Sequence, residues 1–258
     1  MGRKLILTPI AISLTVFTFV FGGALFGIYL HSVLPEHHLN GESRDTLRVA
    51  MGLIATMTAL VLGLQLGSAK SSFDIQKNEV TDLSAKIIQL DRVLAHYGPD
   101  ANAVRDLLRS SVEERLDRIW PQERTQRAPL QPTPLGNEDI YEKIQELSPT
   151  TDVQRTAKAH ALSIVFDIGQ TRWLMIEQQS TSASMPPLMF VMSFCLMISF
   201  ISFGLFAPRN ATVIVTFAVC AMSVSGAIFL IMELYSPFNG VIRIPSDPLR
   251  NALAHMGQ

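Results

Sequence analysis

Four long apolar stretches constrain the fold more than any other feature of the sequence. They cover residues 5–30, 49–69, 187–206 and 211–234. Each is about as long as the roughly 20 residues that a helix needs to cross the hydrocarbon core of a bilayer. None contains Lys or Arg, and Glu233 is their only acidic residue. Because a backbone in hydrocarbon must satisfy its own hydrogen bonds, we predict an all-α, polytopic membrane protein with four transmembrane helices.

The composition agrees with this class and excludes others. Hydrophobic residues make up 48% of the 258 residues and charged residues only 17%, which is unlike a disordered chain or an ordinary soluble enzyme. Lys and Arg (21) nearly balance Asp and Glu (22), so no basic surface for nucleic acid is expected. Cys195 and Cys220 lie in apolar stretches, where a thiol behaves as a small hydrophobe, and they predict neither a disulfide nor a zinc site.

The first stretch is predicted to be a retained span rather than a signal peptide. It follows Arg3 and Lys4, as a signal sequence would, but its apolar run exceeds the roughly 7–15 residues of a signal h-region. Gly22, Gly23 and Gly27 make it a candidate for close contact with another helix, since small residues let helices approach one another.

The distribution of Lys and Arg predicts the orientation, because basic residues near the ends of spans resist translocation. Most of them lie in residues 70–185, with others at the N-terminus and in the tail, whereas the two remaining loops carry few. Both termini and residues 70–185 are therefore expected in the cytoplasm. The predicted organisation is a first helix pair with a short outer loop (1–69), a cytoplasmic helical domain (70–185), a second helix pair (186–235) and a cytoplasmic tail (236–258).

A heptad pattern follows the second apolar stretch. Apolar residues recur every seven positions, and a companion position is filled in the same register: Phe73, Val80, Ile87 and Leu94, with Leu83, Leu90 and Tyr97. This 3.5-residue period is that of a helix packed along one seam. Because nothing breaks the helix after the second span, we predict one continuous helix that ends at Gly98-Pro99. Further helices are predicted at 101–120, 137–147 and 150–179, with a Pro-rich loop after the first of them.

The second span carries two different faces on a helical wheel. One, the small face, would let another helix approach and consists of Gly52, Ala59, Gly63 and Gly67, with Thr56 in the same stripe. The opposite one, the polar face, combines an amide and several hydroxyls: Thr58, Val61, Gln65, Ser68 and Ser72. An amide in hydrocarbon needs a partner or water. Gln65 therefore either bonds to a neighbouring helix or, with copies from other subunits, lines an aqueous path.

Glu233 is the one intramembrane carboxylate and is therefore a candidate functional group. It also lies near the predicted cytoplasmic end of its span, beside Tyr235 and Ser236, where water can reach it, and both interpretations stay open. No nucleophile stands at motif spacing from a base, and no glycine-rich phosphate loop occurs, so we do not expect an enzyme. His37 and His38 are expected to be solvated rather than to bind a metal, and no cofactor is predicted.

Three segments, together with the order of the elements, resemble the bestrophin-like bacterial membrane proteins. They are ALVLGLQLGSAKSSFD (59–74), LDRVLAHYGPDANAVRDLLR (90–109) and MELYSPFNGVIRIPSDPL (232–249). The last is the most specific, through Glu233, Pro237, Phe238, Gly240, Arg243, Ser246 and Pro248. The resemblance implies four spans in the bacterial cytoplasmic membrane, and a ring of five subunits whose second spans line an ion pore. It implies no calcium gating, because no acidic run matches the calcium clasp of bestrophins.

Two functional hypotheses follow. The first is a homo-oligomeric ion channel in which the small face packs between subunits and the polar face lines the conduit. The second is a membrane-anchored scaffold or sensor without conduction, whose cytoplasmic helices recruit partners, and the heptad pattern motivates it. The expected partners are the lipid bilayer, further copies of the chain and, for a channel, inorganic ions.

Overall fold

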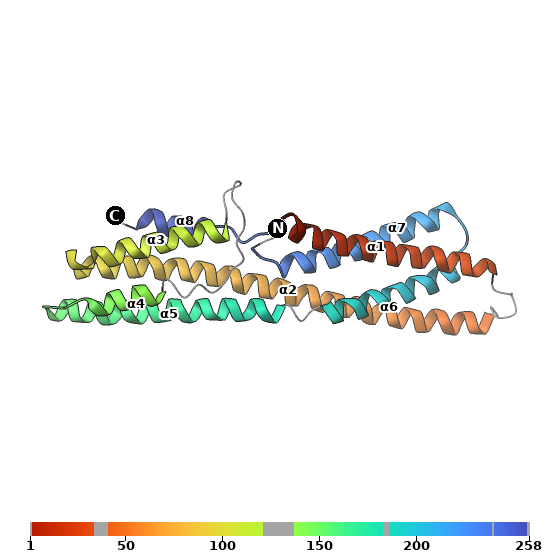
Figure 1. Cartoon of the computed structure of the whole chain (residues 1–258). Helices are drawn as coiled ribbons and strands as arrows, with labels where there is room; N and C mark the ends of the chain where they lie inside the picture. The colour runs from red at the N-terminus through yellow and green to blue at the C-terminus, as the bar shows by residue number, and fades with distance from the viewer. Residues whose placement is uncertain (1, 34–40, 121–136, 183–185, 239, 257–258) are drawn as a thin grey trace. The chain divides into compact units, whose positions relative to one another are not determined.

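The computed structural model describes residues 2–33, 41–120, 137–182, 186–238 and 240–256 (Figure 1). These residues form helices and connecting turns and contain no strand, which confirms the predicted all-α class. In chain order the helices are α1 (Gly2–Val33), α2 (Gly41–Tyr97), α3 (Asn102–Ile119), α4 (Asn137–Glu146), α5 (Asp152–Ser182), α6 (Pro186–Leu205), α7 (Ala211–Leu234) and α8 (Asp247–His255).

Three of these helices are long and apolar enough to cross a membrane. They are α1 over Pro9–His31, α2 from Val49 onward, and the whole of α7. The third predicted span coincides with α6, whose apolar part Phe190–Leu205 is shorter than the other three. The chain is therefore that of a helical membrane protein, and the crossing of α6 stays a prediction.

The chain divides into two compact units. The first, here called the span unit, comprises Arg3–Phe73 and Ser182–Ile242 and contains α1, α6, α7 and the first part of α2. The second, the bundle unit, consists chiefly of Asp74–Thr181 and Arg243–Gln258. It contains the rest of α2 together with α3, α4, α5 and α8.

Five heptad positions of α2 are buried in the bundle unit. Val80, Ile87, Leu90, Leu94 and Tyr97 each expose 4% or less of their surface. The last four contribute to one apolar cluster with residues of α3, α4, α5 and α8, as the 3.5-residue period predicted.

The predicted continuous helix is also confirmed. α2 runs without interruption to Tyr97 and begins at Gly41, earlier than the apolar stretch itself. Gly98 ends it with φ 117°, a backbone conformation that residues with a Cβ rarely adopt.

Two polar contacts tie the end of α2 to its neighbours within the bundle unit. The buried carboxylate of Asp91 accepts two hydrogen bonds from Arg105, from Nε at 2.8 Å and from Nη2 at 3.0 Å. This hydrogen-bonded pairing is the main cause that raises the pKa of Arg105 above its ordinary value. The side-chain amide of Gln154 donates to the carbonyl oxygen of Tyr97 at 3.1 Å, which joins the start of α5 to the end of α2.

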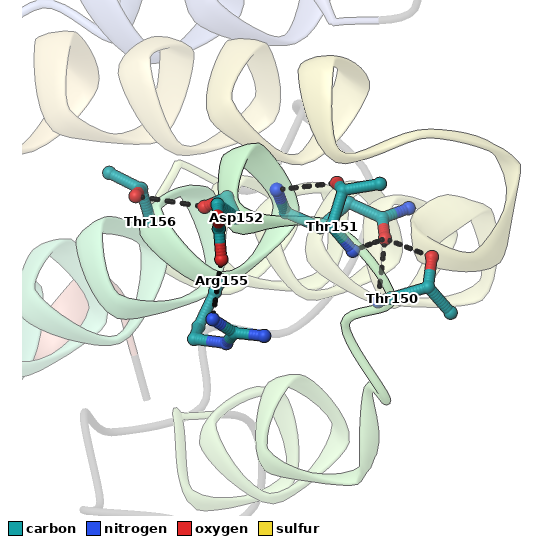
Figure 2. A network of polar contacts seen from close by, with 6 residues as sticks. Thr150, Thr151, Asp152, Arg155 and Thr156 are labelled. Atoms are coloured by element: carbon teal, nitrogen blue, oxygen red, sulfur yellow. Dashed lines mark hydrogen bonds and ion pairs between the residues drawn. The ribbon is translucent and has the colours of Figure 1, made fainter.

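Figure 2 shows the polar network at the start of α5. The Thr151 hydroxyl accepts the N–H of Gln154 at 3.2 Å. The Gln154 side-chain oxygen in turn accepts the N–H groups of Thr150 at 2.9 Å and of Thr151 at 3.3 Å. These reciprocal bonds satisfy N–H groups that the first turn of a helix leaves without a helical partner. They explain why α5 begins close to the predicted position.

The C-terminal segment contains a helix that the sequence pattern did not predict. α8 packs on α3 and buries Leu249 and Ala252 in the apolar cluster of the bundle unit. Trp120, directly after α3, donates its indole N–H to the carbonyl oxygen of Ile244 at 2.9 Å. Residues 244–256 are therefore part of the packed bundle.

The helices α1 and α6 cross closely within the span unit because both carry glycine at the crossing. A Cβ at Gly27 would lie 2.9 Å from the carbonyl carbon of Ile201, and one at Gly204 would lie 3.1 Å from that of Ala24. Gly23 also faces α6, whereas nothing lies within 4 Å of a Cβ at Gly22. The expectation of close helix contact is therefore confirmed for Gly23 and Gly27, and Gly22 meets no helix among the described residues.

Gly27→Ala is expected to destabilise the span unit. The added methyl group would overlap the carbonyl group of Ile201, and neither backbone can retreat without opening the α1–α6 contact. We expect a loss of about 1–3 kcal/mol. The measurement is thermal unfolding of the detergent-solubilised protein, followed by circular dichroism of its helices. Gly22→Ala is the matched control because its methyl group meets open space; equal melting temperatures for the two variants would contradict the close crossing.

Candidate functional site

The residues of the predicted polar face do not share one environment in the structure. Val61 and Ser68 are exposed, and Gln65 and Ser72 are partly buried. Thr58 is buried, and its hydroxyl donates to the carbonyl oxygen of Ile54 at 2.8 Å, within its own helix. Such a bond satisfies the hydroxyl locally, so Thr58 needs no partner from another helix or from water. Within the membrane-spanning part of α2, Gln65 and Ser68 are therefore the polar side chains of this face that reach the surface of the helix.

The small face of α2 meets no neighbour among the described residues. A Cβ at Gly52, Gly63 or Gly67 would find nothing within 4 Å, and Ala59 is exposed. The spanning part of α2 is also the least buried of the three candidate spans, at 11% against 28% for α1 and 22% for α7. The close packing predicted for the small face therefore does not occur among the residues that the structure describes in one copy of the chain.

The turn that follows α7 carries a set of hydrogen bonds within the span unit. Ser236 donates its N–H to the carbonyl oxygen of Glu233 at 3.0 Å, and Gly240 donates its N–H to that of Ser236 at 3.1 Å. Pro237 and Phe238 are buried between these two bonds. The chain thus folds back over the end of its own helix.

The Glu233 side chain holds this turn from inside. Its carboxylate is fully buried, and its Oε2 accepts the N–H of Val241 and, at 3.3 Å, that of Ile242. Two successive N–H groups aimed at one oxygen form a small anion-binding concavity. Gly240 makes room for it, because a Cβ there would lie 3.1 Å from the carboxyl carbon. The sequence left open whether water reaches Glu233. In the structure of the single chain the side chain is fully buried, so the prediction of contact with water is wrong there.

The second oxygen of this carboxylate, Oε1, is also buried, and it finds no hydrogen-bond partner among the described residues. The same holds for the hydroxyl of Tyr235, two residues along the chain. A buried polar atom without a hydrogen-bond partner destabilises a fold by roughly 1–3 kcal/mol. The bonds to Oε2 therefore stabilise the turn, whereas the buried Oε1 and the Tyr235 hydroxyl destabilise it.

The remaining residues of the C-terminal motif lead from the turn into α8. Arg243 is exposed, and Pro248 lies in the first turn of α8. Ser246 precedes α8, and its hydroxyl oxygen accepts a hydrogen bond from Nε of Arg250 at 2.9 Å. The described residues of the motif MELYSPFNGVIRIPSDPL thus comprise the end of α7, the turn that follows it, and the start of α8.

Positive charge gathers at one place in the bundle unit. The side chains of Arg115, Arg118 and Arg172 are near enough to influence one another electrostatically. Burial, followed by the charge of Arg172, lowers the pKa of Arg115 to about 10, and burial together with Arg118 lowers that of Arg172. Arg118 is paired with Glu114 at 2.5 Å.

We find no candidate metal site in the described part of the chain. No group of three or more His, Cys, Asp or Glu side chains that could hold a metal ion occurs among the described residues. His37 and His38 lie outside them. Cys195 is partly buried and Cys220 exposed, and both are free thiols.

The fold and the C-terminal motif together define a class, that of all-helical membrane proteins whose second span extends into a helical bundle. Within that class, the family model of the bestrophin-like domain matches residues 18–249, from within the first span to the first turn of α8. The chain belongs to the bestrophin-like family. Comparison with the curated proteins gives no match, and comparison with the solved structures gives none.

The packing roles of Glu233 and Trp120 were not predicted from the sequence. The side chain of Glu233 binds residues eight and nine positions ahead, and Trp120 binds a carbonyl 124 residues away. One available signal was the spacing of Glu233 and Gly240, because a glycine where a buried carboxylate must fold back removes a clash.

Gly240→Ala is expected to lower the stability of the turn by about 1–3 kcal/mol, because its methyl group would overlap the Glu233 carboxylate. The measurement is a double-mutant cycle by thermal unfolding, in which the same substitution is made beside Glu233→Ala. The cost should fall in that background, because the clashing group is gone. Gly226→Ala in α7 is the control, since nothing lies within 4 Å of its Cβ. An unchanged cost of Gly240→Ala in the two backgrounds would refute the arrangement.

Proposed function

We propose that the chain is a subunit of a homo-oligomeric ion channel in the bacterial cytoplasmic membrane. Four helices cross the bilayer in this proposal: α1, the first part of α2, α6 and α7. Both termini and the bundle unit lie in the cytoplasm. Membership of the bestrophin-like family supports the proposal, and the concentration of Lys and Arg outside the outer loops supports the orientation.

The observation that carries the proposal is the exposure of α2. Within the described ranges its small face meets no neighbour, while Gln65 and Ser68 present polar groups at membrane depth on another side. A single copy in lipid would leave the Gln65 amide in hydrocarbon, which is costly. Several copies, five by analogy with bestrophins, would pack their small faces together and turn their polar faces toward a shared aqueous path.

The proposed conduit is lined by the exposed and half-buried members of the polar face, Val61, Gln65, Ser68 and Ser72, and the buried Thr58 of that face lies behind them. Within it we assign the ion contacts to Gln65 and Ser68, because the Thr58 hydroxyl is engaged with its own helix. The substrate is an inorganic ion, and the chain carries out no catalysis in this proposal.

Gln65→Leu is expected to change ion flux through liposomes that contain the purified protein, measured separately under potassium, sodium and chloride gradients. Removal of a polar contact worth about 1 kcal/mol per ion changes the rate by roughly fivefold. Thr56→Val is the matched control, because Thr56 lies on the small-face stripe and its hydroxyl donates to the carbonyl oxygen of Gly52. Flux that is equal in Gln65→Leu and the wild type would remove Gln65 from the conduit.

Gln65→Glu tests the same position through charge. A ring of carboxylates would attract cations and repel anions, so the ratio of potassium to chloride flux should rise, by roughly tenfold for a change of about 1.4 kcal/mol. The shift should weaken as ionic strength increases, because salt screens the ring. A ratio that does not respond to the carboxylate would contradict an aqueous path at this depth.

A second function, that of a non-conducting scaffold or sensor, is favoured by one observation on α5. Phe166 and Trp173 lie seven residues apart, on one side of the helix, and are 69% and 66% exposed. Large aromatic side chains this exposed on a polar unit are typical of surfaces that bind partners. For a scaffold, Phe166→Ser should abolish capture of a partner by the full chain, whereas Val153→Ser on the other side of α5 should not. Capture that survives both substitutions would exclude this surface.

A further inference from the structure

The helix α5 carries apolar side chains on two of its sides. Its inner side is buried in the apolar cluster of the bundle unit through Ala161, Ile164, Val165 and Ile168. A second set recurs on another side, at alternating steps of three and four residues, and we call it the outer seam: Ala159, Leu162, Phe166, Gly169, Trp173 and Ile176.

The spacing of the outer seam is typical of a helix that packs along another helix. Its members form two series with a period of seven residues, and Ale of one series is replaced by none of the other: Ala159, Phe166 and Trp173 make up the first. A 3.5-residue period keeps one edge of a helix against its neighbour over several turns. The heptad positions of α2 have the same period, and they are buried in the core of the bundle unit.

The outer seam, in contrast, is open. Phe166 and Trp173 are 69% and 66% exposed, Ala159 is exposed as well, and the other three members are only partly buried. Apolar surface in contact with water is unfavourable by about 25 cal/mol per Å². The seam therefore combines the spacing of a helix contact with the exposure of a surface that no described residue covers.

The size of the seam favours a second copy of the chain over a separate protein as its partner. A Phe or Trp side chain buries about 150–250 Å² when it is enclosed, so the two rings offer roughly 250 Å² per copy at these exposures. A complex of two free proteins buries about 800 Å² on each partner. Copies in one membrane need less, because their spanning helices hold the seams at the same level and raise their local concentration.

The membrane also sets the direction of such a contact. All copies have the same orientation in the bilayer, so their α5 helices run parallel and meet at equal heights. Gly169 then lies between the levels of Phe166 and Trp173 in both copies. A residue without a side chain at this level leaves room for the aromatic rings above and below it.

We propose that the outer seams of neighbouring copies pack against each other as parallel helices in register. The contact joins the bundle units of the oligomer. It rests on the homo-oligomer of the proposed function and not on conduction. It assigns the exposed aromatic side chains of α5 to self-association rather than to the capture of a different protein.

The test is disulfide cross-linking of the full chain in native membrane vesicles, with Cys195 and Cys220 replaced by alanine. Ala159→Cys places one thiol on the outer seam and keeps both aromatic rings. Mild oxidation should link two copies at this position. Asp167→Cys is the matched control, because Asp167 is exposed on another side of α5, and it should stay monomeric.

Phe166→Ser tests the apolar contact itself. Added to Ala159→Cys, it should lower the cross-linked fraction roughly tenfold, because an aromatic side chain no longer packs between the copies. Phe166 is exposed in the single chain, so the helix content measured by circular dichroism should not change. Val153→Ser is the control, since Val153 is 71% exposed on the other side of α5, and it should leave the cross-linked fraction unchanged.

Ala59→Cys on the small face of α2 reports the oligomer independently of the seam. Cross-linking at Ala59→Cys but not at Ala159→Cys would overturn the outer seam and leave the homo-oligomer standing. Cross-linking at Ala159→Cys alone would support the seam and remove the small face from the subunit contact. Absence of both products would overturn both proposals.

Two further outcomes would also overturn the outer seam. One is equal cross-linking of Ala159→Cys and Asp167→Cys, which indicates random collision of copies. The other is a cross-linked product of Ala159→Cys that contains a different protein, which would assign this surface to a recruited partner.

Discussion

Hydrocarbon offers no hydrogen-bond partners, and this constraint shapes the whole span unit. The backbone in an apolar stretch must satisfy itself, so the stretches become helices. Hydroxyls follow the same rule, since those of Thr56, Thr58 and Thr216 each donate to a carbonyl one turn earlier in their own helix. At the end of α7 the chain must leave the helix, and the carboxylate of Glu233 accepts the N–H groups of Val241 and Ile242 from the segment that follows. In the turn after α7, backbone N–H groups are thus again hydrogen-bonded within the chain, beyond the end of the helix.

The same constraint identifies two features of α2 that the single chain does not satisfy, its small face and the Gln65 amide. α1 and α6 bring glycine against backbone and bury it, whereas α2 carries an equally small face that no described part of the chain covers. The amide of Gln65 lies in the same helix, and a long amide side chain cannot satisfy itself as a threonine hydroxyl does. In our proposal, oligomerisation accounts for both the uncovered small face and the unsatisfied Gln65 amide. Further copies of the chain cover the small face, and water fills the space between the polar faces.

Local and periodic features of this fold could be predicted from the sequence, and contacts between distant segments could not. The heptad positions from Val80 to Tyr97 follow from side-chain spacing alone, and Gly98 marks the end of α2 because its backbone is left-handed. α8 is short and polar on average, so no long apolar period marks it. The bond from Trp120 to Ile244 joins residues far apart in the chain. The small and polar faces could be read from the wheel, but the burial of Thr58 depends on its neighbours in space.

The central claim is that the polar face of α2 borders water inside the membrane, and thiol accessibility tests it most directly. With Cys195 and Cys220 replaced by alanine, single cysteines would be introduced as Gln65→Cys, Ser68→Cys and Leu60→Cys in the protein reconstituted in lipid. A water-soluble thiol reagent that does not cross membranes should modify the first two and spare the third, because Leu60 lies on another side of the helix. Equal modification at all three positions, or none at any of them, would contradict an aqueous path along α2.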